Sequence, residues 1–156
     1  YECETSGMRN IVARNIDVVH YSMNYRAPTE YWANAIIWLQ PNQDMLMEKC
    51  RFENIRVRSD GDDILMLMAK PMRCRYGEYQ HPEPGALRDC SFKDIQVFGE
   101  RGRFQGLFYL LGDSEKHAVT GLRFENVSYF GEPVQQQAPC VQIGPFVSDV
   151  TFRGSN

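Results

Sequence analysis

A nine-residue segment, Lys49–Val57 (KCRFENIRV), recurs along the chain and limits the fold more than any other feature of the sequence. Related segments lie at Asn10–Val18, Asp89–Val97 and Gly121–Tyr129, and an incomplete copy lies at Asp149–Asn156. The aligned copies share an apolar second position, a Phe at the fourth position in every copy but the first, and an Asn or Asp at the sixth position in every copy but the last. Self-similarity of this kind is the signature of a repeat architecture.

The repeat alternates apolar and charged residues and then changes phase. Cys50 and Phe52 alternate with charged neighbours, as expected for a strand with one buried face. Ile55 and Val57 are also apolar, but they lie an odd number of residues after Phe52, so a straight strand would point them to the opposite face. One interior can hold both pairs only if the chain turns at Asn54, and Asn adopts left-handed backbone angles more readily than most residues. We therefore predict a corner at this column, with the side chains of successive copies bonded in a ladder. The ladder would consist of Asn15, Asn54, Asp94 and Asn126.

A second apolar strand is predicted ahead of each later copy of the repeat. These strands are Ala35–Leu39, Ile64–Ala69, Gly106–Leu111 and Cys140–Ile143. The spacing between copies is unequal, which is typical of fixed strands joined by loops of variable length. No intervening stretch has the length and 3.6-residue periodicity of a crossover helix. The predicted fold is all-β: one right-handed parallel β-helix domain, residues 1–156, with about five coils that each rise about 4.8 Å.

The pattern resembles the pectin-lyase-like β-helices, and in particular the C-terminal coils of polygalacturonase-like proteins of glycoside hydrolase family 28. The residues that carry the resemblance are Phe52–Ile55 (FENI), Phe124–Val127 (FENV), Glu4–Ile11 (ETSGMRNI) and Ser59–Ile64 (SDGDDI). It covers nearly the whole chain as a fold pattern and implies a secreted or periplasmic protein that acts on polysaccharides. The Asn-Thr-Asp, Gly-His-Gly and Arg-Ile-Lys motifs of that family do not occur in the sequence, nor is a signal peptide recognised in it.

Composition excludes several classes of partner. The chain has 156 residues, 43% hydrophobic and 24% charged residues and a formal net charge of −3, which suits one globular domain. The negative charge and the lack of a basic run argue against nucleic acid, and no apolar run approaches the ~20 residues of a membrane span. The five cysteines lack metal-ligand spacing. Cys50 and Cys90 occupy the inward second column, where we expect small buried hydrophobes, with a disulfide between neighbouring coils as the alternative.

The two ends of the predicted solenoid are open. Tyr1–Ser6 would enter in the middle of a coil, and Thr151–Gly154 would stop within a strand. Because unpaired strand edges recruit partners and solenoids require polar caps, the alternatives are a fragment of a longer β-helix or ends that are buried in an assembly. We predict a homo-oligomer, either a dimer or a trimer.

Three loops carry the candidate functional residues. Ser22–Asn34 contains Tyr25, Tyr31 and Trp32, which suit stacking on sugar rings or form a local core. Arg58–Asp63 places Asp60, Asp62 and Asp63 beside Gly61. This segment is a polar turn, a glycosidase acid/base or nucleophile, or a Ca²⁺ site. No other cofactor or metal is predicted. Lys70–Leu87 contains Arg73, Arg75, Tyr76, Tyr79 and His81. The arginines would bind uronic-acid carboxylates, and His81 would transfer protons. The alternative is an ordinary surface loop.

Two functions are compatible with these features. The first is binding or hydrolysis of an acidic polysaccharide, with two carboxylates for the chemistry. The second is a non-catalytic β-helix that serves in assembly or carbohydrate binding. A second carboxylate on a coil next to the Asp60–Asp63 turn would favour hydrolysis, and Glu48 and Glu100 are the candidates. Fold alone does not decide between the two functions.

Overall fold

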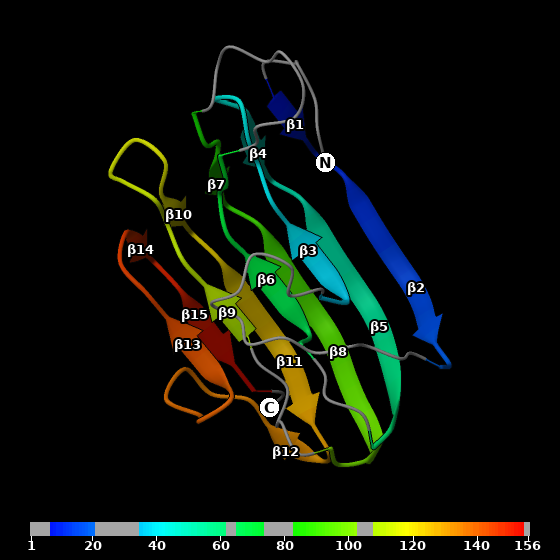
Figure 1. Cartoon of the computed structure of the whole chain (residues 1–156). Helices are drawn as coiled ribbons and strands as arrows, with labels where there is room; N and C mark the ends of the chain where they lie inside the picture. Colours follow the sequence, from blue (N-terminus) through cyan, green and yellow to red (C-terminus); the bar gives the residue numbers. More distant parts are fainter. Residues whose placement is uncertain (1–6, 21–34, 62–64, 74–82, 103–107, 155–156) are drawn as a thin grey trace.

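The computed structural model describes residues 7–20, 35–61, 65–73, 83–102 and 108–154, and these residues form β-strands and connecting turns without a helix (Figure 1). Accordingly, these ranges contain no helix that is long and apolar enough to span a bilayer. The strands belong to three sheets, and almost all strand pairs are parallel. The all-β class predicted from the sequence is confirmed.

The chain visits the three sheets in a fixed rotation. The first sheet contains β1 (Gly7–Arg9), β4 (Leu46–Glu48), β7 (Ala86–Arg88), β10 (Val119–Thr120) and β14 (Val147–Ser148). The second contains β2 (Val12–Val18), β5 (Arg51–Asp60), β8 (Ser91–Glu100) and β11 (Arg123–Tyr129), with β15 (Thr151–Arg153) parallel and β12 (Glu132–Pro133) antiparallel to β11. The third contains β3 (Ile37–Leu39), β6 (Leu67–Ala69), β9 (Phe108–Leu110) and β13 (Val141–Ile143). After each circuit the chain returns beside the strand it formed one repeat earlier.

Both predicted sets of strands are present, and one set was missed. The strands predicted ahead of each repeat form the third sheet, with shorter bounds. The first sheet was not predicted, because its strands of two or three residues are too short to show a hydrophobic period. The strands predicted on the two sides of Asn54 are a single strand, β5, which continues through that residue in the second sheet.

The Phe column of the repeat forms the centre of the core. Phe52, Phe92, Phe124 and Phe152 are in register across the second sheet. Their rings stack almost parallel, with centroid separations of 5.1, 4.7 and 4.3 Å. Phe108 of the third sheet meets the ring of Phe124 edge-on at 5.8 Å. The predicted stack of phenylalanines is therefore confirmed, and it joins two of the sheets.

The predicted left-handed column is also confirmed. Asn15, Asn54, Asp94 and Asn126 have φ angles of 58°, 51°, 54° and 51°. The Asn54 amide donates to Oδ1 of Asn15 at 2.9 Å, and the Asn126 amide donates to Oδ1 of Asp94 at 2.6 Å. A second left-handed column, which the sequence analysis did not predict, precedes the second sheet. It consists of Asn10, Lys49, Asp89, Gly121 and Asp149.

The residue before the Asn column alternates in charge along the solvent face of the second sheet. Arg14, Glu53, Lys93, Glu125 and Arg153 are register partners in that order. Lys93 Nζ lies 2.7 Å from Oε1 of Glu125, and this contact raises the pKa of Lys93. Opposite charges on adjacent strands favour this register, because a shift would separate these pairs.

Candidate functional site

Polar side chains line a shallow groove on the outer face of the second sheet. One cavity of about 290 Å³ is lined by Asp17, Val18, Val19, Arg56, Arg58 and Phe98. A neighbouring cavity of about 250 Å³ is lined by Asn54, Arg56, Asp94, Ile95, Gln96, Asn126 and Ser128. Arg56 lines both cavities, which are neighbours on the outer faces of β2, β5, β8 and β11. We refer to these lining residues together as the outer groove.

Arg56 is held rigidly at the centre of the outer groove. Its Nε and Nη2 donate to the two carboxylate oxygens of Asp17 at 2.7 and 2.8 Å, and this hydrogen-bonded contact raises the pKa of Arg56. The side chain of Arg58 is 62% exposed, and its Nε lies 3.4 Å from Oδ1 of Asp60. Bidentate contacts fix the plane of a guanidinium group. The groove therefore offers one fixed and one more exposed cation beside amide and hydroxyl groups.

A second carboxylate lies beside Asp60 at the carboxyl end of the second sheet. Asp60 and Glu100 are register partners on the adjacent strands β5 and β8. Oδ2 of Asp60 lies 2.9 Å from Nδ1 of His20. Gly61 follows Asp60 with a φ of 91°, and a Cβ at this position would lie 3.6 Å from Oε2 of Glu100. Glu48, the other candidate, lies in the first sheet, where its carboxylate contacts Arg9 at 2.8 Å.

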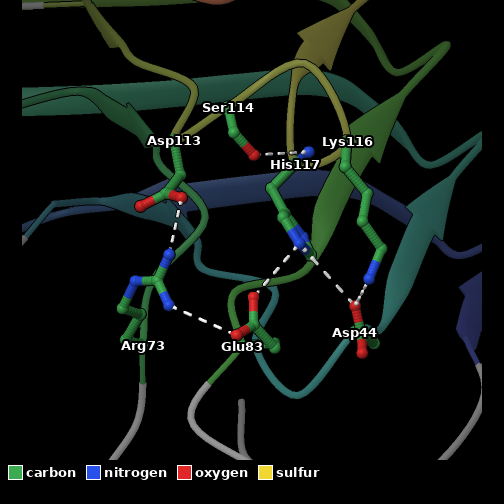
Figure 2. Close-up of polar contacts among 7 residues, drawn as sticks. All are labelled: Asp44, Arg73, Glu83, Asp113, Ser114, Lys116 and His117. Atoms are coloured by element: carbon green, nitrogen blue, oxygen red, sulfur yellow. Dashed lines mark hydrogen bonds and ion pairs between the residues drawn. The ribbon is translucent and has the colours of Figure 1, made fainter.

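A separate cluster of charged groups joins the turns between the third and first sheets (Figure 2). Arg73 contacts Asp113 at 3.1 Å and Glu83 at 3.5 Å. His117 Nε2 lies 3.5 Å from Oε2 of Glu83 and 3.7 Å from Oδ1 of Asp44. Lys116 Nζ is 2.8 Å from the same Asp44 oxygen, and Asp44 raises the pKa of Lys116. We refer to this network, together with Ser114, as the corner cluster; it links turns from three successive circuits of the chain.

The corner cluster changes the interpretation of two residues. Arg73, predicted to bind a substrate carboxylate, already contacts two carboxylates of the chain itself. Short connections usually run over the surface, but His117, in the connection between β9 and β10, is only 4% exposed. Its backbone N–H donates to Ser114 Oγ at 3.3 Å and its carbonyl accepts from the Asp113 N–H at 3.0 Å. The tight turn Asp113–His117 (DSEKH) is the only sequence feature that accompanies this burial. Because the turn occurs in one copy, the repeat pattern could not predict that His117 is buried.

Most of the predicted site residues lie outside the described part of the chain. These are Tyr25, Tyr31, Trp32, Asp62, Asp63, Arg75, Tyr76, Tyr79 and His81. Within the described ranges, Asp60 and Arg73 lie in different clusters, at the end of the second sheet and in the corner cluster respectively. Those ranges hold no group of three or more His, Cys, Asp or Glu side chains placed to bind a metal ion. The calcium alternative at Asp60, Asp62 and Asp63 stays a prediction.

The described cysteines are buried free thiols. Cys50, Cys90 and Cys140 are 1%, 0% and 8% exposed. Burial raises the pKa of Cys90 to about 12 and also raises the pKa of Cys140. A thiol with a raised pKa is protonated at neutral pH and is a weak nucleophile. Cys90 and Cys140 therefore suit packing rather than catalysis.

Comparison of the chain with models of protein families, with curated proteins and with solved structures found no match. The assignment of a function therefore depends on the geometry of the chain itself.

Proposed function

We propose that the chain is a right-handed parallel β-helix of the pectin-lyase-like type that binds an acidic polysaccharide along the outer groove. The rotation of the chain through three parallel sheets supports the β-helix, because each circuit adds one strand to every sheet. The stacked Phe and Asn columns support it further, because only coils in constant register align the same repeat position.

The two neighbouring cavities, which share Arg56, carry the functional proposal. A linear glycan lying across β2, β5, β8 and β11 would meet a new strand about every 4.8 Å, which is close to the length of one sugar residue. Amides, a hydroxyl and carboxylates in the groove match the hydroxyl groups of sugars. The 40% exposed ring of Phe98 offers an apolar face for stacking.

The arginines of the groove select for acidic sugars in this proposal. Arg58 faces solvent. Among the described residues, its only ion pair is with Asp60, at 3.4 Å. Guanidinium groups bind carboxylates through paired hydrogen bonds. A uronic-acid carboxylate would therefore bind Arg58, while Arg56, already paired with Asp17, positions the neighbouring hydroxyl groups.

Hydrolysis of the bound glycan is a second candidate function, and the pairing of Asp60 with Glu100 favours it. Retaining glycosidases hold two carboxyl groups about 5–5.5 Å apart, a separation that side chains on adjacent strands can reach. The contact between His20 Nδ1 and Oδ2 of Asp60 orients this carboxylate. Asp60 would thus serve as the nucleophile, and Glu100 would serve as the acid that protonates the leaving oxygen.

Binding is tested by titrating polygalacturonate oligomers into the wild-type protein and into Arg58→Gln. We expect the variant to bind at least about tenfold more weakly, because a charge-assisted bidentate contact contributes about 1.5–3 kcal/mol. Arg123→Gln is the matched control, since Arg123 is exposed on the same sheet but lies outside the groove. Equal affinity for all three proteins, or no binding by the wild type, would refute the proposal.

Hydrolysis is tested separately, by reducing-sugar release with Glu100→Gln and Asp60→Asn. Loss of release with retained binding identifies the pair as catalytic. Binding without release by the wild type leaves a non-catalytic glycan-binding β-helix, which is the alternative function.

A further inference from the structure

The Asn ladder is interrupted in the middle of the second sheet, at Asp94. The Asn54 amide on β5 donates to Oδ1 of Asn15 on β2 at 2.9 Å, and the Asn126 amide on β11 donates to Oδ1 of Asp94 on β8 at 2.6 Å. Among the residues that the structure describes, no hydrogen bond joins Asn54 to Asp94, although β5 and β8 pair in register on both sides of them. The ladder therefore has a gap between β5 and β8.

The chemistry of residue 94 explains the gap. An amide carries its nitrogen on one side and its oxygen on the other, so Asn54, whose nitrogen bonds toward β2, turns its Oδ1 toward β8. Asp94 accepts from β11 through its Oδ1, which leaves its Oδ2 on the side of β5. A carboxylate accepts hydrogen bonds but has no donor to offer. Two acceptor oxygens consequently face each other across this step of the ladder.

The gap opens into the outer groove. Asn54 and Asp94 both line the cavity of about 250 Å³ that they share with Arg56. The side of the sheet that carries them faces solvent: Asn54 is exposed and Asp94 is half-buried. A ligand that places donor groups between the two oxygens gains a hydrogen bond to each, and the bond to the charged oxygen is the stronger one. The gap is therefore a place in the groove that selects for donor groups.

We infer that the ladder gap is the subsite for a vicinal diol of the bound sugar. One hydroxyl group donates to Oδ1 of Asn54, and the hydroxyl group on the adjacent carbon donates to Oδ2 of Asp94. This inference rests on the proposed binding of an acidic polysaccharide in the outer groove, and it adds a requirement that the proposal lacked. The ligand is a uronic-acid polymer in which the diol carries no substituent, with Arg58 on the carboxylate and the ladder gap on the diol.

Asp94→Asn is the sharpest variant, because it closes the gap with almost no change of shape. The new amide would donate to Oδ1 of Asn54 while its oxygen still accepts from Asn126, so both acceptors of the subsite are lost together. The change also removes a negative charge from the groove, which by itself would strengthen the binding of an acidic polymer. A loss of affinity in this variant therefore cannot come from the change of charge.

Asp89→Asn is the matched control. Asp89 has the same φ of 54° as Asp94 and is exposed, but it belongs to the other left-handed column and does not line the outer groove. The control thus makes the same substitution, removes the same charge and keeps the same backbone conformation. Without ligand, Asp94→Asn should raise the Tm by about 2–4 °C, the shift that one added hydrogen bond gives in a chain of this length, and Asp89→Asn should not.

The ligands are polygalacturonate oligomers and the same oligomers with their vicinal hydroxyl groups acetylated, titrated into the wild-type protein and both variants. We expect the wild type and Asp89→Asn to bind the unmodified oligomer about tenfold more tightly than the acetylated one, since acetylation removes both donors. Asp94→Asn should bind the unmodified oligomer about tenfold more weakly than the wild type and should distinguish the two oligomers by less than about twofold.

Three results would overturn the inference and leave the proposed function in place. The first is an Asp94→Asn variant that binds the unmodified oligomer as tightly as the wild type or more tightly. The second is an Asp94→Asn variant that keeps the wild-type preference, because acetylation would then act through its bulk. The third is an unchanged Tm, because the ladder would have no gap to close. Failure of the wild type to bind either oligomer is a different result, which refutes the proposed function and the inference together.

Discussion

The repeat position held by Ile16 in β2 and by Ile95 in β8 has the same residue but not the same environment. Ile95 lies on β8, which pairs with both β5 and β11, and is 1% exposed; Ile16 lies on β2, which among the described residues pairs with β5 alone, and is 39% exposed. Intrinsic preferences at this position are equal, so the number of neighbouring strands accounts for the difference in burial. Stability in stacked repeats is approximately a sum of repeat and nearest-neighbour terms. The inner strands should therefore carry most of the stability, and the predictions below test this from the largest effect to the smallest.

Truncation of a stacked ring should have the largest effect. Phe92 is 1% exposed and stacks between Phe52 and Phe124. We expect Phe92→Ala to lower the free energy of unfolding by about 3–5 kcal/mol, measured by urea denaturation. Phe98→Ala, on the same strand but 40% exposed, is the control and should change it by less than about 1 kcal/mol. Similar losses in the two variants would contradict the importance of the inner column.

A direct comparison within one column comes next. Ile95→Ala should cost about 2–5 kcal/mol because it leaves a cavity in the core beside β5 and β11. Ile16→Ala should cost about 1 kcal/mol, since less apolar surface is lost from the interior. Equal costs would mean that β2 is covered in solution as completely as β8.

The left-handed column can be divided into its backbone and side-chain contributions. Asn54 has a φ of 51° and donates to Asn15. We expect Asn54→Ala to cost about 1–2 kcal/mol, because Ala is strained at this φ and the hydrogen bond is lost. Asn54→Gly removes the bond without the strain and should cost less. If Asn54→Gly and Asn54→Ala lower the free energy of unfolding equally, the whole effect comes from the lost hydrogen bond of the ladder.

The sequence predicted those parts of the molecule in which most copies of the repeat are alike. The Phe stack and the left-handed Asn column were predictable, because several copies share one residue type at the same position. The first sheet was not predictable, since strands such as Val119–Thr120 are too short to show a period. The corner cluster was not predictable either, since Arg73, Glu83 and His117 occur once each and meet only through the winding of the chain. Glu100 could be named as a candidate, but its position beside Asp60 depends on the register of β5 and β8.

Alkaline pH should lower the stability of the core through Cys90. Its pKa is raised from 9.0 to about 12, mainly by burial, so the thiol stays protonated in the folded chain after it has ionised in the unfolded chain. Its contribution to stability is thus complete below pH 9 and declines as the pH rises from 9 to 12. We expect a loss of about 1 kcal/mol by pH 10. Cys90→Val should flatten the stability profile over this range, and an unchanged profile would contradict the assignment to Cys90.

The outward charge column should give the smallest effect, because its members lie in solvent. Lys93 and Glu125 are 49% and 54% exposed and 2.7 Å apart, and exposed ion pairs contribute about 0–1 kcal/mol. We expect Lys93→Ala to lower the free energy of unfolding only slightly at low salt, with the difference disappearing in about 1 M NaCl. Lys93→Glu should cost more than Lys93→Ala, because it places like charges between Glu53 and Glu125 on the adjacent strands and like charges repel at this spacing. If charge reversal costs no more than truncation, the alternating column would contribute neither stability nor register.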